Sequence, residues 1–205
     1  MRPRTMAVVA PCLLSPYTVY RGAVEKDVAA AAAVRACLGR HPDVDLLSFP
    51  CPEFILLGFP RPPAPREVYE RLGMREVAER VAAFIERVIA EEAPGHVVLV
   101  GVKGSPTCAA ATTSSGDPDS YPYDLRERFR SLPKGERLRV AAGIAASFGS
   151  VGRPGILFEL LRTRVVGTYL DFDKDRIPES VASLEAALRR DSGGAFFPGG
   201  RGCAV

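Results

Sequence analysis

Short apolar segments alternate with segments of helical character along most of this chain, and this alternation limits the folds that it can adopt. Five segments are expected to form buried strands, at residues 6–10, 43–49, 96–102, 137–146 and 165–170. Five others are expected to form helices, at residues 25–38, 67–92, 125–130, 155–161 and 178–190, with Gly73 as a candidate break in the second. Strands that alternate with helices predict a parallel sheet with helices on both faces. We therefore expect an α/β fold, a three-layer Rossmann-like or flavodoxin-like arrangement.

The bulk composition is that of a soluble globular protein. Hydrophobic residues make up 47% of the 205 residues and charged residues 25%. We expect a single α/β domain over residues 1–191 and an irregular, Gly-rich tail over residues 192–205. No apolar run reaches the roughly 18 residues that a membrane helix needs, and the apolar start is too short for a secretory signal. The expected location is therefore cytoplasmic, and a net charge of +3 is too small to indicate a nucleic-acid partner.

The five cysteines of the chain fall into two groups. Their odd number, in a chain without a signal peptide, argues against a disulfide framework. Cys12, Cys51 and Cys108 follow the first, second and third expected strands, and parallel strands would bring these three loops to one edge of the sheet. That edge is where this architecture binds ligands. Cys37, near the end of a helix, and Cys203, in the tail, are expected to be ordinary thiols.

Three converging thiolates suit zinc, copper(I) or an iron–sulfur cluster. Structural zinc usually takes four ligands with closely spaced Cys pairs, and the sequence has no such pair. A 4Fe–4S cluster on Cys12, Cys51 and Cys108 would leave one iron with an exchangeable site. Glu53, two residues after Cys51, is then a candidate acid or base, and Ser105 is a candidate hydrogen-bond partner at the open iron.

Four stretches of the first half carry a family resemblance. They are Pro11-Cys12-Leu13-Leu14-Ser15 with Tyr20-Arg21-Gly22, Cys51-Pro52-Glu53, Gly58-Phe59-Pro60-Arg61-Pro62-Pro63, and Gly104-Ser105-Pro106-Thr107-Cys108. In order and rough spacing they resemble the 2-thiouracil desulfidase family. The chain departs from the family pattern at Ser15, Val19, Arg21, Thr107 and Ala109, where the family has Gly, Arg, Asp, Ser and Gly. The departures lie in the stretches around Cys12 and Cys108 and leave the three cysteines themselves in place.

The resemblance implies that Cys12, Cys51 and Cys108 hold a 4Fe–4S cluster and that Glu53 and Ser105 are catalytic residues beside its open iron. It further implies that this iron takes up the thiocarbonyl sulfur of a thiolated pyrimidine, and that water replaces the sulfur at carbon without a redox step. The expected partner is thus a small thiolated molecule. Whether it is a free base, a nucleoside or a residue within RNA stays open, as does the oligomeric state.

Two other functions remain open at this stage. The first is a binding module that carries a cluster, or a set of redox-sensitive thiols, and handles sulfur or senses oxygen without turnover. The second is a flavodoxin-like protein that binds a flavin or nucleotide, with backbone amides of residues 112–115 around a phosphate. Lys103 is expected to be a surface charge, and Arg61-Pro62-Pro63 a rigid loop.

Overall fold

The computed structural model describes residues 4–189. The Gly-rich tail expected at residues 192–205, with Cys203, lies outside the described residues. Among the helices within residues 4–189, none is long and apolar enough to cross a membrane.

Four parallel strands form the central sheet, in the order β2-β1-β3-β6. They are β1 (Thr5–Val9), β2 (Val44–Ser48), β3 (His96–Val102) and β6 (Thr168–Phe172). In the register of the sheet, Val8 of β1 lies between Leu47 of β2 and Leu99 of β3. The chain first adds β2 on one side of β1 and then β3 on the other, so the topological switch point lies between β1 and β3. The expected α/β fold, a three-layer Rossmann-like or flavodoxin-like arrangement, is confirmed.

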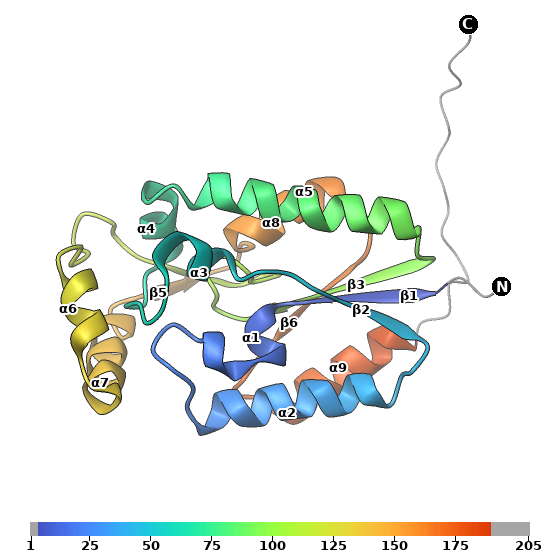
Figure 1. Ribbon diagram of the computed structural model, residues 1–205, viewed down its shortest axis with the longest axis horizontal. Helices are drawn as coiled ribbons and strands as arrows, with labels where there is room; N and C mark the ends of the chain where they lie inside the picture. Colours follow the sequence, from blue (N-terminus) through green and yellow to red (C-terminus); the bar gives the residue numbers. More distant parts are fainter. Residues whose placement is uncertain (1–3, 190–205) are drawn as a thin grey trace, which may run out of the picture.

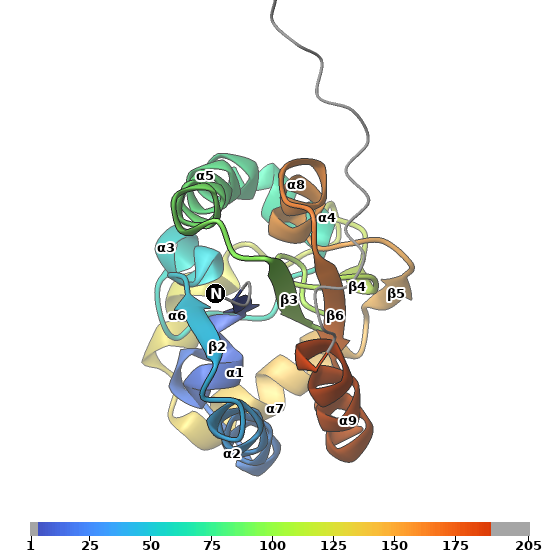
Figure 2. The ribbon, with the colours of Figure 1, turned by 90° about the vertical axis from the view of Figure 1, so that its right-hand side faces the viewer.

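Helices cover both faces of this sheet (Figures 1 and 2). On one face α2 (Glu25–Gly39) packs beside α9 (Ile177–Leu188), and on the other α5 (Met74–Glu92) packs beside α8 (Ile156–Arg164). The central strands β1 and β3 are almost wholly buried, whereas the edge strands β2 and β6 are largely half-exposed. Continuous apolar runs therefore mark the strands that are covered on both faces.

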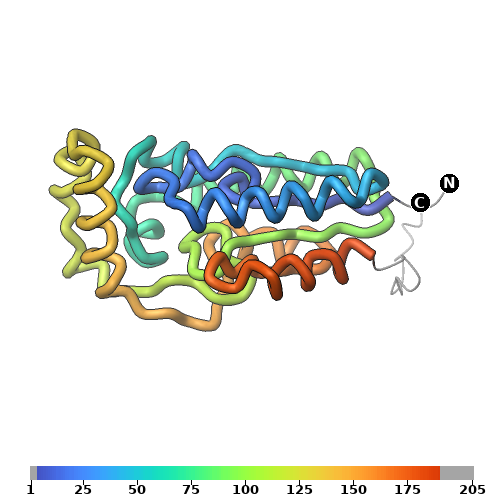
Figure 3. The backbone as a smooth tube through the Cα atoms, turned by 90° about the horizontal axis from the view of Figure 1, so that it is seen from below, coloured from blue at the N-terminus to red at the C-terminus, as the bar shows by residue number. Residues whose placement is uncertain are grey.

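Shorter elements gather beyond the carboxyl ends of the strands. They are α1 (Pro11–Leu14), η1 (Pro16–Thr18), α3 (Pro52–Leu57), α4 (Arg66–Arg71), α6 (Leu125–Ser131) and α7 (Lys134–Ala145). A small antiparallel sheet joins β4 (Thr113–Ser115) to β5 (Gly149–Val151). Figures 1 and 3 show α6 and α7 side by side at this end of the molecule, away from the N-terminus. The end that the switch point marks for ligand binding is thus walled by these short elements.

The prediction of a strand at residues 137–146 is wrong, because this segment forms most of helix α7 and its C-cap. Its Ala, Leu and Arg residues favour a helix, and Pro133 stands at the N-cap, just before the first turn. Only Ala141 of the helix is fully buried. Leu138, Val140 and Ile144 suggest a buried strand in the sequence, but they belong to a helix with little buried surface.

Two expected elements have shifted boundaries. The long helix expected at residues 67–92 is divided into α4 and α5 at Gly73, whose φ of +85° ends the first helix. The last strand begins at Thr168 rather than at residue 165, because α8 runs on to Arg164 and the Val165 N–H still bonds the carbonyl of Leu161. The expected order of these elements is otherwise confirmed.

A buried arginine connects α4 to α8. Arg66 is fully buried, and its guanidinium bonds Glu70 at 2.9 Å, Glu159 of α8 at 2.7 Å, and the carbonyl of Pro154 just before α8. The neighbouring pair of Arg71 and Asp119, with side chains 47% and 80% exposed, offers a matched comparison on the same helix.

We expect Arg66→Met to lower the free energy of unfolding by about 2–3 kcal/mol. This is less than the roughly 3–5 kcal/mol for breaking a fully buried ion pair, because solvent screens the two partly exposed carboxylates. Arg71→Met should cost at most about 1 kcal/mol. Urea denaturation of both variants measures the difference, and an equal loss in the two would contradict the assigned role of Arg66.

Candidate active site

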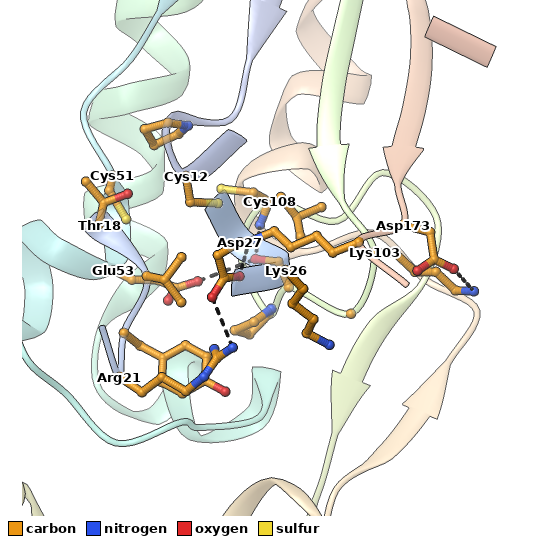
Figure 4. A pocket seen from close by; sticks show the side chains of 18 of the residues that line it. Cys12, Thr18, Arg21, Lys26, Asp27, Cys51, Glu53, Lys103, Cys108 and Asp173 are labelled. Atoms are coloured by element: carbon orange, nitrogen blue, oxygen red, sulfur yellow. Dashed lines mark hydrogen bonds and ion pairs between the residues drawn. The ribbon is translucent and has the colours of Figure 1, made fainter. Parts of the chain in front are cut away.

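A cavity of about 300 Å³ lies at the carboxyl ends of the strands, and Cys12, Cys51 and Cys108 all line it. Glu53 and Ser105 line the same cavity. Figure 4 shows the three cysteine side chains grouped together with Glu53 beside them. The structure thus brings together all five residues that the sequence singled out. Their roles as ligands and catalysts remain predictions.

Proline residues place Cys12 and Cys51 at the starts of short helices. Cys12 is the second residue of α1 and follows Pro11, while Cys51 is the N-cap of α3 and precedes Pro52. Proline fits the first turn of a helix because the N–H that it lacks has no partner there in any case. Each chain segment therefore turns into a helix soon after its strand ends, and the thiol stays at the rim of the sheet.

The loop that carries Cys108 folds back onto the end of β3. Gly104 adopts a φ of +79°, which allows the reversal. The Val102 N–H then donates to the Cys108 carbonyl at 3.0 Å, and the Cys108 N–H donates to Ser105 Oγ at 3.0 Å. Ser105 therefore holds the backbone of Cys108 as well as facing the cavity.

Two neighbouring elements fix this loop from outside. The first amides of α8, on Ile156 and Leu157, donate to the carbonyls of Pro106 and Thr107 at 3.0 Å each. The Asp171 carboxylate of β6 accepts the backbone amides of Ala110, Ala111 and Thr112. Because both contacts bond the backbone, β6 and α8 hold the Cys108 loop in addition to the hydrogen bond from the Cys108 N–H to Ser105 within the loop.

Glu53 is a buried carboxylate, and both of its oxygens accept hydrogen bonds. Its Oε2 accepts from Arg61 at 2.8 Å and from the Tyr69 hydroxyl at 3.2 Å. Its Oε1 accepts from Thr107 Oγ1 at 2.7 Å and from Ser105 Oγ at 3.4 Å. Burial opposes ionisation, but the Arg61 charge and the hydrogen bonds outweigh burial and hold the pKa of Glu53 below its usual value. The carboxyl is therefore ionised at neutral pH.

The three thiols have raised pKa values. Burial, followed by the charge of Glu53, raises the pKa of Cys51 to about 11, and burial also raises the pKa of Cys12 and, further, that of Cys108. Each cysteine is a neutral thiol unless a cation is bound, because metal ligation requires the thiolate. Arg61 Nη2, 3.9 Å from Cys51 Sγ, is the nearest permanent positive charge that the described contacts give to this sulfur.

Paired charges line the other side of the cavity. Asp27, only 1% exposed, accepts from Arg21 at 3.1 Å and from Lys174 at 2.9 Å. Figure 4 shows the contact between Arg21 and Asp27. Lys103, expected to be a surface charge, is half-exposed at the cavity edge, where it pairs with Asp173 at 2.9 Å.

Sequence reasoning missed the partners of Glu53. The sequence predicts Arg61 as part of a rigid loop, whereas its side chain is 2% exposed and bonds the Glu53 carboxylate. The position of Arg61 within a proline-rich run is the one sequence feature that could have indicated this contact, because a rigid loop does not require a charged residue. For Tyr69, sixteen residues from Glu53 along the chain, no local pattern indicated the contact.

A second possible ligand set lies where the end of α2 meets α9. Cys37, His41 and Glu185 have ligand atoms within 4.8 Å of one another, and the carboxylate of Glu185 already bonds Arg40 and Arg189. Cys37 is fully buried, in keeping with the ordinary packed thiol expected from the sequence. The two arginines account for the carboxylate without a metal ion.

Comparison with known families covers nearly the whole chain. The family described as "Putative 2-thiouracil desulfurase" matches residues 4–190. The chain belongs to this family. The match extends through the second half, from about residue 124, which the sequence motifs did not reach. Membership in a desulfurase family supports an enzyme that acts on a thiolated compound. No curated protein and no solved structure matches the chain.

Two glycines, one in β3 and one just before α8, allow the Cys108 loop to pack directly against the backbone of these elements. A Cβ atom on Gly101 of β3 would stand 2.1 Å from the Cys108 carbonyl oxygen, and one on Gly155 would stand 2.5 Å from the Thr107 carbonyl carbon. Atoms cannot approach this closely, so any side chain at either position must push the loop away.

We expect Gly155→Ala to displace the Cys108 loop and to lower the free energy of unfolding by about 1–3 kcal/mol, as for other overpacked sites. The displaced thiol should be alkylated faster in the metal-free protein, which peptide mass spectrometry measures. Gly152→Ala is the control, because a Cβ there meets nothing within 4 Å. Unchanged alkylation of Cys108 in Gly155→Ala would show that the contact does not position the thiol.

Proposed function

We propose that this protein is a desulfidase that removes sulfur from a small thiolated pyrimidine such as 2-thiouracil by non-redox hydrolysis, using a 4Fe–4S cluster held by Cys12, Cys51 and Cys108. The observation that carries the proposal is the meeting of these three cysteines, from the ends of three different strands, with Glu53 and Ser105 in one cavity. Membership in the 2-thiouracil desulfurase family supports the reaction class.

The spacing of the thiols favours a polynuclear centre over a single ion. Ligands about 2.3 Å from a tetrahedral zinc lie about 3.8 Å apart. Within residues 4–189, Cys37, His41 and Glu185 are the trio whose ligand atoms all lie within 4.8 Å of one another, so at least two of the sulfurs of Cys12, Cys51 and Cys108 are farther apart than this. A wide triangle of soft donors fits a multi-iron core.

The charges around the thiols also fit a cluster. Three thiolates and the sulfides of a cubane carry net negative charge, and a buried negative centre needs a nearby cation. Arg61 lies within 3.9 Å of Cys51 Sγ, and its Nε is a buried donor without a partner among the described residues. Lys174, the charge that acts most strongly on Cys12, lines the same cavity.

The reaction exchanges one bond for another without a redox step. The C=S bond of the substrate breaks, a C=O bond to the water oxygen forms, and the sulfur leaves as hydrosulfide with one proton released. When bound, the cluster would supply an iron with an open coordination site for the departing sulfur.

We assign the proton transfer to Glu53 and Ser105. Glu53 is ionised, so its Oε1 can accept a proton from the attacking water. Of its four contacts, the 3.4 Å hydrogen bond from Ser105 is the longest and the most easily exchanged for water. Ser105, held by the Cys108 N–H, is thus suited to pass a proton between the substrate side and the carboxylate. Arg61, Tyr69 and Thr107 orient the carboxylate.

Anaerobic reconstitution is the direct test of the cluster. We expect a brown protein with about four irons and about four acid-labile sulfides per chain, because three thiols hold one cubane. This protein should release sulfide and uracil from 2-thiouracil. Cys51→Ser should lose both the iron and the activity.

Cys37→Ser is the matched control, since Cys37 lies outside the cavity and should not affect iron content. A colourless, iron-free protein that still desulfurises 2-thiouracil would rule out the mechanism. Bound cluster without turnover on any thiolated base would favour a sulfur-handling module instead.

Removing the charge of Glu53 should separate catalysis from cluster binding. We expect Glu53→Gln to lower kcat by about 10²–10⁴, the usual contribution of a general base. Tyr69→Phe removes one hydrogen-bond donor and keeps the carboxylate, so kcat should fall by less than about tenfold. Sulfide release is compared per mole of bound iron, so that a loss of cluster is not counted as a loss of catalysis. Equal effects in the two variants would argue against Glu53 as the base.

A further inference from the structure

A second cavity, of about 240 Å³, adjoins the cysteine-lined one. Tyr20, Glu53, Gly104 and Pro106 line both cavities, so the two meet along a shared wall that contains the ionised carboxylate. None of the cysteines within residues 4–189 lines the second cavity. Whatever the thiols hold, this space stays available beside Glu53.

The two cavities differ in chemistry. The first is lined by the thiols and by charged pairs such as Lys103 with Asp173. The second is lined mainly by rings and small apolar groups, with Glu53, Ser114 and the tyrosines as its polar members. The tyrosines are Tyr20 and Tyr69, and the apolar lining includes Pro63, Pro106, Ala145 and Phe148. Apolar and aromatic walls with a few fixed polar groups are typical of sites for planar heterocycles.

The size also fits a six-membered ring. A cavity of about 150 Å³ is enough to bind benzene, so about 240 Å³ admits a pyrimidine with its exocyclic atoms. One wall comes from the turn between α7 and β5, where the Phe148 N–H bonds the Ala145 carbonyl at 3.1 Å. The pairing of Gly149 with Ser115 ties this turn to β4.

We infer that the second cavity holds the pyrimidine ring of the substrate, with the thiocarbonyl directed past Glu53 towards the thiols. The inference rests on the proposed function and adds a location and two specificity-determining residues, Ala145 and Phe148. Both belong to the α7–β5 segment, to which the family motifs of the first half assign no role. Ring size and ring substituents are then selected by this turn rather than by the charged wall.

A cavity-filling variant tests the inference. Ala145→Leu adds three carbon atoms to the wall, whereas Ala142→Leu adds the same atoms on the exposed part of the same helix. We expect Ala145→Leu to weaken uracil binding at least tenfold, measured by calorimetry on the cluster-free protein. It should also raise KM for 2-thiouracil at least tenfold in the reconstituted enzyme. Ala142→Leu should leave both values and the melting temperature unchanged.

Phe148→Ala provides a second variant should Ala145→Leu fold poorly, and the loss of one ring wall should likewise weaken uracil binding. Wild-type values of uracil affinity and KM in folded Ala145→Leu or Phe148→Ala would overturn the ring site and leave the proposed function intact. Absence of sulfide release from the wild type would contradict the proposed function. The uracil titration would still decide whether the cavity holds the ring.

Discussion

The buried ion pair of Glu53 and Arg61 is the interaction on which the arrangement of this site depends. One carboxylate receives donors from the proline-rich loop, from α4 through Tyr69 and from the Cys108 loop through Thr107, so it joins segments that are distant in sequence. Removing one partner from a buried pair typically costs about 3–5 kcal/mol, because the other charge is left without compensation. The Glu53 carboxylate, kept charged by Arg61, joins the segment after β2 to the segment after β3 through its 2.7 Å hydrogen bond from Thr107, close to where Cys51 and Cys108 emerge.

Parallel strands explain why three cysteines could be grouped from the sequence. A strand that is buried on both faces reads as a continuous apolar run, and β1 and β3 both do so. Once the sheet is parallel, every residue just after a strand lies at one edge, so Cys12, Cys51 and Cys108 follow from the order of elements alone. Helix α7 shows the limit of this reading. Its apolar residues resemble a strand, although its helix-favouring residues and Pro133 point to a helix, and the exposure of much of its surface is not evident from the sequence.

The contacts that hold the site were harder to predict, because they join residues with no common local pattern. Asp171 lies on β6, the strand next to β3, and accepts the backbone amides after Cys108. Asp27 reads as an ordinary acidic residue in the first turn of a helix, yet it is buried between Arg21 and Lys174. The Arg21 that departs from the family pattern thus has a partner supplied by a different element. Such pairings depend on how close two segments lie in the folded structure, and a single sequence does not give this distance.

Glu53 lies in the wall between a charged cavity with thiols and an apolar cavity with aromatic rings, and this position gives its burial a chemical reason. Replacing a sulfur on a ring carbon by water requires the ring to be held, the sulfur to face a soft acceptor and the water to meet a base. A base at the boundary can serve a carbon whose ring lies on one side and whose sulfur lies on the other. An unpaired carboxyl in such a wall would take up a proton, because burial penalises the charge. Arg61 prevents this, so the cation that stabilises the fold also keeps the carboxylate ionised, as the proposed role of Glu53 as a base requires.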